Sequence, residues 1–146
     1  MKNMNYNVKK IGKKILHFEN DRFIGGVFEV KFESEGFDFK LLAQTPEKSD
    51  DLIKLVLEEK PDLIIMGVIL PVRDGYTATK ILKSNKLTKN IPIFGLDDLG
   101  LAEDINRARE SGMTDYLVNA HYTPSEIVDI IKIFFVTPKK YQPRYK

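Results

Sequence analysis

The chain has 146 residues, enough for one domain with a sizeable hydrophobic core. It contains no cysteine, which excludes disulfide bonds, thiolate nucleophiles and cysteine-ligated zinc. No apolar run approaches the ~18 residues that a membrane-spanning helix needs, and the polar first residues lack the pattern of a secretory signal. These features favour a cytoplasmic globular domain.

The net charge of +2 conceals an uneven distribution along the chain. Residues 15–131 hold 13 basic and all 21 acidic side chains, a net charge of −8, whereas each end carries five basic residues and no acidic one. We therefore expect a basic N-terminal extension (residues 1–12), a central folded domain (13–136) and a basic C-terminal tail (137–146). Because tyrosines lie among these lysines, nucleic-acid binding through the termini is one interpretation. Binding to an anionic lipid or to an acidic protein surface, and tails that only increase solubility, are the others.

Five short apolar segments alternate with segments of helical periodicity, a pattern typical of α/β proteins with a parallel sheet covered by helices on both faces. Strands are expected near residues 14–18, 38–43, 62–67, 91–96 and 115–118. Helices are expected near residues 21–35, 47–59, 75–85, 101–111 and 124–136.

The first predicted helix has an unusual composition. Asp21 precedes it and is expected to cap it. Gly25 and Gly26 lie inside it, where each glycine costs about 1 kcal/mol relative to alanine. Its apolar residues extend beyond one narrow stripe, so it either packs deeply with the glycines at a close approach or has a second apolar surface for a partner.

The last predicted helix has the clearest start. Thr123 is expected to be the N-cap, Pro124 occupies the first helical position, and Glu126 completes a capping box. Apolar residues then recur at i, i+3, i+4, i+7 and i+8 from residue 127, which predicts one buried stripe.

The motifs at the strand ends resemble those of the receiver domain of two-component response regulators. The sequence KILHFEND at 14–21 is similar to the first receiver strand with its acidic cluster, and KPDLIIMG at 60–67 with VILPVRDG at 68–75 is similar to strand 3 and its Asp-Gly turn. IPIFGL at 91–96 and SGMTDYLV at 111–118 resemble strand 4 and the approach to strand 5. This resemblance covers about residues 13–135 and implies a flavodoxin-like, doubly wound sheet of strand order 2-1-3-4-5 with five helices.

The resemblance also identifies the positions of the phosphorylation site. In the family, an aspartate ending strand 3 accepts the phosphoryl group and holds a divalent metal together with an acidic pair after strand 1. The matching residues here are Gly67, Glu19 and Asn20. Asp97 stands at the Thr/Ser position of strand 4, and Asn119 at the lysine position of strand 5. The sequence therefore predicts a degenerate receiver, or pseudo-receiver, with no metal, no cofactor and no catalysis.

Two further positions follow from the resemblance. Tyr116 matches the aromatic residue whose rotamer reports phosphorylation in receivers, although a half-buried strand aromatic is the alternative. Ile105, Arg107 and Arg109, together with Tyr116, are the predicted interaction face, because the family uses helix 4, strand 5 and helix 5 for pairing. A solvated helix would have the same mixed charges.

Titratable groups give weaker signals. His17 has no partner at catalytic spacing and is predicted to be a hydrogen-bonded core histidine. Asp97, Asp98 and Glu19 are expected to adjoin one another, which either raises the pKa of one carboxyl or leaves them as solvated loop acids.

We therefore expect a phosphorylation-independent protein-interaction module in a bacterial signalling or regulatory complex. Its partner would be a kinase, an effector, another receiver or a second copy of the chain. One alternative is a nucleic-acid-associated protein that uses its basic termini. The other is a sensor whose emptied pocket binds a small molecule.

Overall fold

The computed structural model of the chain describes residues 10–98 and 100–145, so most of the predicted N-terminal extension lies outside the described residues. The strands are β1 (Lys14–Phe18), β2 (Asp38–Leu42), β3 (Leu63–Gly67), β4 (Ile93–Asp97) and β5 (Asp115–Val118). The α-helices are α1 (Arg22–Ser34), α2 (Ser49–Glu59), α3 (Gly75–Lys83), α4 (Ala102–Ser111) and α5 (Pro124–Val136). Two 3₁₀ turns, η1 (Asn119–His121) and η2 (Pro138–Lys140), follow β5 and α5. In the described part of the chain, no helix has the length and apolar character to cross a membrane.

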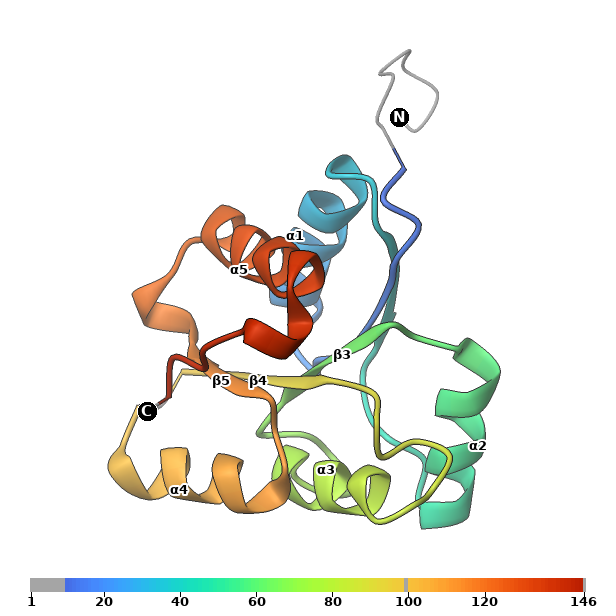
Figure 1. Cartoon of the computed structure of the whole chain (residues 1–146). Helices are drawn as coiled ribbons and strands as arrows, with labels where there is room; N and C mark the ends of the chain where they lie inside the picture. Colours follow the sequence, from blue (N-terminus) through green and yellow to red (C-terminus); the bar gives the residue numbers. More distant parts are fainter. Residues whose placement is uncertain (1–9, 99, 146) are drawn as a thin grey trace.

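The five strands form one parallel sheet in the order β2-β1-β3-β4-β5. Helices α1 and α5 cover one face of the sheet, and α2, α3 and α4 cover the other (Figure 1). The predicted flavodoxin-like fold with five helices is therefore confirmed. In such a sheet the carboxyl ends of the strands open into a crevice where the strand order reverses, and that crevice positions the candidate site.

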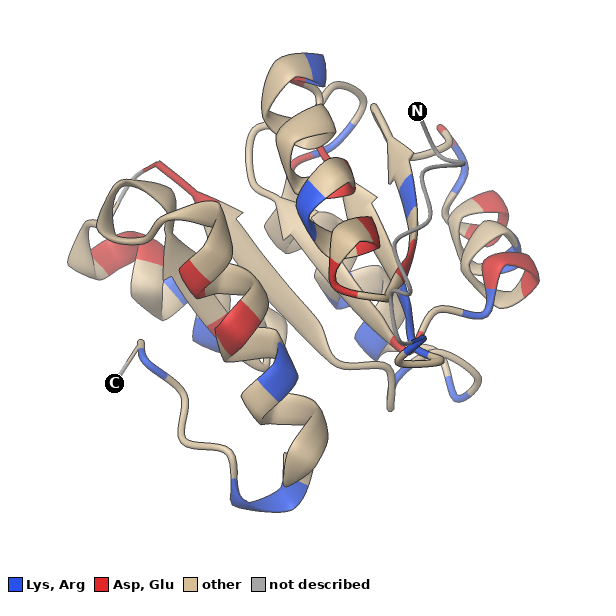
Figure 2. Cartoon of the chain, turned by 90° about the horizontal axis from the view of Figure 1, so that it is seen from above, with Lys and Arg blue, Asp and Glu red and all other residues tan. Residues whose placement is uncertain are grey.

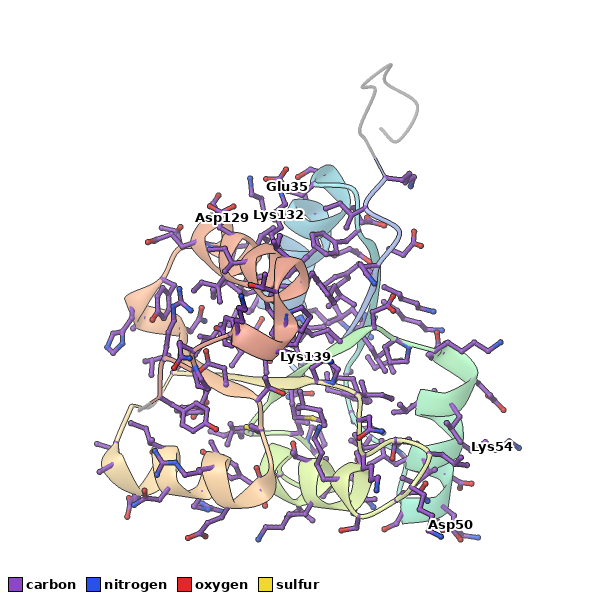
Figure 3. The ribbon with its side chains drawn as sticks, viewed as in Figure 1. Glu35, Asp50, Lys54, Asp129, Lys132 and Lys139 are labelled. Atoms are coloured by element: carbon purple, nitrogen blue, oxygen red, sulfur yellow. The ribbon has the colours of Figure 1, made fainter. Side chains whose placement is uncertain are left out.

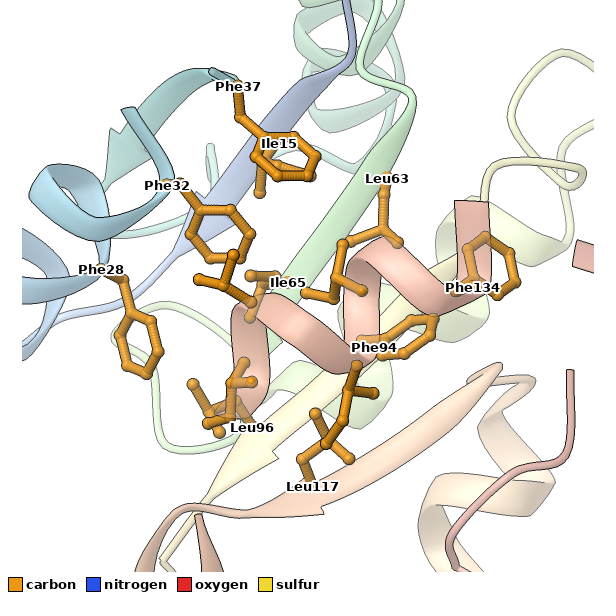
Figure 4. Close-up of a cluster of buried hydrophobic side chains, with 14 residues drawn as sticks. Ile15, Phe28, Phe32, Phe37, Leu63, Ile65, Phe94, Leu96, Leu117 and Phe134 are labelled. Carbon is orange, nitrogen blue, oxygen red and sulfur yellow. The ribbon is translucent and has the colours of Figure 1, made fainter. Parts of the chain in front are cut away.

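Each face of the sheet has its own hydrophobic core. The core under α1 and α5 is rich in aromatic rings, which Figure 4 shows packed over the sheet strands: Phe28, Phe32, Phe37, Phe94 and Phe134. The core under α2, α3 and α4 is mainly aliphatic. β3 is buried along its whole length because both cores cover it, which explains its uninterrupted apolar sequence.

Helix α1 shows both of the features between which its sequence did not decide, a close approach to the sheet at a glycine and a second apolar surface. A Cβ at Gly25 would lie 2.5 Å from Cδ2 of Leu41, so this glycine permits the close approach of α1 to β2. On the other side of the helix, Phe23 and Val30 are 81% and 68% exposed. The helix thus packs deeply by one face and has a second apolar surface.

The predicted helix caps are confirmed. Asp21 accepts hydrogen bonds from the backbone N–H groups of Phe23 and Ile24. Thr123 and Glu126 form a reciprocal capping box at the start of α5. Glu35, just after α1, lies 3.3 Å from Nζ of Lys132 in α5, and this ion pair joins the two helices at one end (Figure 3).

His17 is fully buried in β1, but its predicted hydrogen bond is wrong. Its ring packs edge-on against Phe28 and Phe39, with ring centroids 5.7 and 5.8 Å away. Neither ring nitrogen has a hydrogen-bond partner among the described residues. Burial without a partner disfavours the charged imidazolium and lowers the pKa of His17 to about 3.

The described part of the C-terminal tail, residues 137–145, packs against the domain instead of extending from it. After α5 the chain turns at a basic stretch and runs back toward β5 and α4 (Figures 1 and 2). The Tyr141 ring contacts Phe94 and Phe134 at centroid distances of 5.6 and 5.3 Å. The Tyr145 hydroxyl donates a hydrogen bond of 3.1 Å to the carbonyl oxygen of Met113. Part of this tail therefore belongs to the folded unit.

Candidate functional site

The predicted site residues meet in a small hollow at the carboxyl ends of the strands, with a volume of about 140 Å³. Glu19, Gly67, Asp97 and Asn119 all line it, because β1, β3, β4 and β5 end there. Asn20 is exposed and does not line the hollow. Three acidic side chains besides Glu19 do so: Asp21, Asp97 and Asp98.

Gly67 ends β3 at a point where backbone surrounds it. A Cβ at this position would lie 2.8 Å from the carbonyl oxygen of Phe18 and 3.3 Å from Cδ2 of Leu70. Gly75, at the start of α3, packs directly against this strand end, because a Cβ there would lie 2.0 Å from the carbonyl oxygen of Gly67. The turn between β3 and α3 therefore packs closely, and a side chain at residue 67 would require the backbone at Phe18 to shift.

The carboxylates around the hollow already have hydrogen-bond partners. Glu19 accepts a hydrogen bond of 3.0 Å from the backbone N–H of Asp21, which itself caps α1. Asp98 accepts a 3.4 Å hydrogen bond from the side-chain amide of Asn119. Burial raises the pKa of the Glu19 carboxyl, and the negative charges of Asp21 and Asp98 raise it further.

This arrangement does not fit a divalent metal ion. Within residues 10–98 and 100–145, no group of three or more His, Asp or Glu side chains is placed to hold a metal. One carboxylate oxygen of Glu19 and one of Asp21 already accept hydrogen bonds from the backbone of the β1–α1 turn, and an octahedral Mg²⁺ site needs several free oxygen ligands at about 2.1 Å.

Tyr116 lies in the interior, beside the hollow. Its side chain is 2% exposed, and its hydroxyl donates a hydrogen bond of 3.2 Å to Oδ2 of Asp97. Burial and the nearby Asp97 carboxylate raise the pKa of the Tyr116 phenol. Tyr76 of α3 is buried next to it, and the Arg107 guanidinium lies 4.5 Å from the centre of the Tyr76 ring. Sequence reasoning missed Tyr76, although an aromatic residue directly after the capping Asp-Gly turn was a signal that could have identified it.

The four residues of the predicted interaction face are spread over different environments. Ile105 is partly buried against the core, and Tyr116 is buried. Arg107 covers the Tyr76 ring, as described above. Arg109 donates a hydrogen bond of 3.2 Å to the carbonyl oxygen of Tyr145 and lies 5.3 Å from its ring centre. The C-terminal tail thus occupies part of this face, and the exposed apolar surface of α1 lies elsewhere.

Comparison with known proteins gives a consistent assignment. Residues 15–132 match the family described as the response regulator receiver domain. The chain is 31% identical over 107 residues, 71% of its length, to the DNA-binding dual master transcriptional regulator RpaA of Synechocystis sp.. It is 30% identical over 122 residues, 84% of its length, to the phosphate regulon transcriptional regulatory protein PhoB of Klebsiella pneumoniae. The chain covers only 42% and 51% of these two regulators.

Solved structures show the same fold. A putative response regulator from Chloroflexus aurantiacus superimposes with a TM-score of 0.75 and 26% identity, over 88% of this chain and 99% of that one. The receiver domain of the sensor histidine kinase PA1611 from Pseudomonas aeruginosa superimposes with a TM-score of 0.73 and 26% identity, over 86% of this chain and 99% of that one. That receiver was solved with a magnesium ion coordinated in its active-site cleft.

Proposed function

The chain belongs to the response regulator receiver domain family, and from this membership we propose that it is a pseudo-receiver acting as a phosphorylation-independent protein-interaction module. The single observation that carries the proposal is the packing at Gly67. The residue has no nucleophile, and a Cβ there would lie only 2.8 Å from the Phe18 carbonyl oxygen. Aspartyl phosphate therefore has no acceptor at the end of β3, and a side chain there would need the backbone to move.

The charge around the hollow supports the same proposal. Among the described residues, its lining includes four acidic side chains and no lysine or arginine. A phosphoryl group carries close to two negative charges at neutral pH and needs cations or N–H donors to compensate them. Asn119, at the lysine position, directs its amide to Asp98 and adds no charge.

The buried tyrosine supports a fixed conformation. Tyr116 donates its hydrogen bond to Asp97, the residue that stands at the Thr/Ser position of receivers. A Thr or Ser hydroxyl there could turn toward a phosphoryl group, whereas a carboxylate would be repelled by it. We infer that Asp97 holds Tyr116 inward irrespective of any phosphodonor, so that regulation depends on the concentration of a partner.

The direct test is titration of the ¹⁵N-labelled chain with Mg²⁺ and beryllofluoride, a mimic of the phosphoryl group. We expect no saturable shift of the backbone amides at residues 19, 67 and 97. A receiver that keeps the strand-3 aspartate serves as the positive control under the same conditions. A saturable shift at the hollow, or a mass increase of one phosphoryl group with acetyl phosphate, would contradict the proposal.

Binding of nucleic acid through the basic termini has less support. Three tyrosines lie among the terminal lysines and are the candidates for base stacking: Tyr6, Tyr141 and Tyr145. Tyr6 lies outside the described residues, and Tyr141 and Tyr145 both make contacts within the fold. Lys139 and Lys140 are exposed and remain candidates for phosphate contacts. A variant with Lys139→Gln and Lys140→Gln separates the two functions, because it leaves the tyrosines in place. Nucleic-acid binding that falls with salt and with this double substitution would favour the alternative.

Binding of a small molecule in the emptied pocket also has less support. The hollow of about 140 Å³ lies below the roughly 300–1,000 Å³ of typical ligand pockets. A thermal shift with a specific metabolite, lost on changing Asn119→Leu, would favour this function over the interaction module.

A further inference from the structure

A groove lies at the amino ends of the strands, on the edge of the sheet opposite the hollow. It is bounded by residues 10–13 before β1, residues 34–37 between α1 and β2, and residues 132–136 at the end of α5, and its volume is about 760 Å³. Glu35 and Lys132, which line it, mark its place in Figure 3. We call it the amino-edge groove. Unlike the hollow of about 140 Å³, it falls within the roughly 300–1,000 Å³ of typical ligand pockets.

The floor of the amino-edge groove is apolar and held in place by the fold. Phe37 is buried, and the Phe135 ring packs on it with 6.1 Å between the ring centroids. Val136 and Ile11 also line the groove and are 78% and 37% exposed. The backbone N–H of Ile11 donates a hydrogen bond of 2.9 Å to the carbonyl oxygen of Gly36, which ties the segment before β1 to the end of α1. Since these walls are already formed, little ordering of the chain opposes the binding of a ligand.

Two lysines of the groove form no ion pair with any residue that the structure describes. Lys10 is exposed, and Lys13 is half-buried with its Nζ 5.5 Å from the centre of the Phe135 ring. Lys14, the next residue along the chain, is by contrast paired with Glu59 at 2.8 Å. The groove therefore places two cations without a carboxylate partner beside an apolar floor.

The acidic side chain of the groove does not neutralise these two lysines. Glu35 lies 3.3 Å from Nζ of Lys132 and 3.7 Å from Nζ of Lys31, so its carboxylate is already paired. Helices α1 and α5 both end at the groove, and the carbonyl groups at the end of a helix attract cations. That attraction accounts for part of the lysine charge but not for the open apolar floor beside it.

We propose that the amino-edge groove binds an amphipathic carboxylate, a molecule with an aliphatic body and one carboxylate at its end. The aliphatic body covers the apolar floor, and the carboxylate lies beside Lys10 and Lys13. One negative charge fits better than two, because Glu35 lines the same groove and repels a second. The site is separate from the hollow at the end of β3, so the inference goes beyond the proposed interaction module and does not depend on it.

Titration of the ¹⁵N-labelled full chain with sodium decanoate, below the concentration at which decanoate forms micelles, tests the site directly. We expect saturable amide shifts confined to residues 10–13, 34–37 and 132–136, with a dissociation constant of roughly 0.1–1 mM for a ligand of this size. Decylammonium has the same aliphatic body with the opposite charge and should bind at least about tenfold more weakly. Acetate, which lacks the aliphatic body, should cause no saturable shift.

Substitutions test the charged and the apolar part of the site separately. Lys10→Gln combined with Lys13→Gln should weaken decanoate binding at least about tenfold, because the carboxylate loses both cations. Lys54→Gln combined with Lys80→Gln is the matched control, since both lysines are exposed, on α2 and α3. Val136→Ser should weaken binding about two- to fivefold by removing apolar contact surface. Circular dichroism of each variant confirms that it is folded before its affinity is compared.

Four results would overturn the inference. Decanoate causes no saturable shift at the amino-edge groove, decylammonium binds there as tightly, the two double lysine variants change the dissociation constant equally, or the chain binds vesicles of anionic lipid but not free decanoate. The last result would assign Lys10 and Lys13 to a membrane surface. None of these results would alter the expected absence of beryllofluoride binding, so the two proposals fail separately.

Discussion

Tyr141 donates a hydrogen bond of 2.6 Å to the carboxylate of Asp115, which is fully buried at the start of β5. The same carboxylate accepts hydrogen bonds from the backbone N–H of Arg144, at 3.0 Å, and of Tyr116, at 2.8 Å. Burial raises the pKa of Asp115, and these donors oppose that rise by stabilising the charged form. One acidic side chain therefore holds the C-terminal tail against the edge of the sheet, beside the predicted interaction face.

We expect Tyr141→Phe to loosen the C-terminal tail without disturbing the aromatic core. The substitution keeps the ring that packs on Phe94 and Phe134 but removes a hydrogen bond to a charged acceptor. Such a bond contributes about 1.5–3 kcal/mol, so the free energy of unfolding in urea should fall by about that amount. Amide hydrogen exchange at residues 141–145 should accelerate.

The matched control is Tyr122→Phe. Tyr122 also packs against this core, but its hydroxyl makes no hydrogen bond with the described residues. Its replacement should change the free energy of unfolding by less than about 0.5 kcal/mol. Equal losses for the two variants would show that Asp115 does not hold the tail.

His17 should make the fold sensitive to acid. Its pKa is lowered to about 3 in the folded chain, against about 6.5 when unfolded, so between these values only the unfolded state binds the proton. Stability is therefore lost as the pH falls from 6.5 toward 3, at about 1.4 kcal/mol per pH unit. The variant His17→Leu lacks this group. From pH 7 to pH 5, the free energy of unfolding of the unmodified chain should therefore fall by about 2 kcal/mol more than that of the variant.

Urea denaturation at several pH values measures this difference. His121→Leu is the control, because His121 is exposed and lies outside the core that surrounds His17. Parallel pH curves for the unmodified chain and His17→Leu would refute the assignment of acid sensitivity to His17.

The strands, helices and candidate site were predictable from the sequence because their signals are local. Each signal acts within a few positions of the chain: the period of the apolar residues, the Asp-Gly turn and the cap residues. The ends of the strands then come together because the sheet is parallel. Glu19, Gly67, Asp97 and Asn119 could therefore be placed at one hollow before their geometry was known. Asn20 was misplaced because adjacent residues at a strand end point in different directions.

The features that the sequence did not predict depend on long-range contacts. The C-terminal tail is held through Asp115 and Tyr141, which lie 26 positions apart, and its basic composition suggested a solvated segment. The position of His17 in a strand did not reveal that Phe28 and Phe39 would surround its ring. Which apolar side of α1 would be buried also depended on the approach of Leu41 to Gly25.

Glu19→Gln should stabilise the fold at neutral pH. Because burial raises the pKa of Glu19 above its value in the unfolded chain, the charged form destabilises the fold above that pKa, and stability is regained as the pH falls through it. Glutamine keeps an oxygen acceptor for the Asp21 N–H but carries no charge. The gain in Tm should therefore be largest near pH 7 and shrink toward pH 4. Glu103→Gln, on the exposed start of α4, is the control, and a gain for Glu19→Gln that does not depend on pH would contradict this origin.

Gly67→Ala should destabilise the fold, because the added Cβ would lie 2.8 Å from the carbonyl oxygen of Phe18 and the backbone must move to admit it. Overpacking of this kind costs about 1–3 kcal/mol, measurable by urea denaturation. Gly26→Ala is the matched control, since a Cβ there meets nothing within 4 Å and should add about 0.5–1 kcal/mol of helix stability.

Gly67→Asp adds further atoms at the same point, so it should lose at least as much stability as Gly67→Ala and still fail to bind Mg²⁺ with beryllofluoride. If Gly67→Asp folds with unchanged stability and gains saturable binding, the β3 end has kept the space of a phosphorylation site, and the chain lost only its nucleophile.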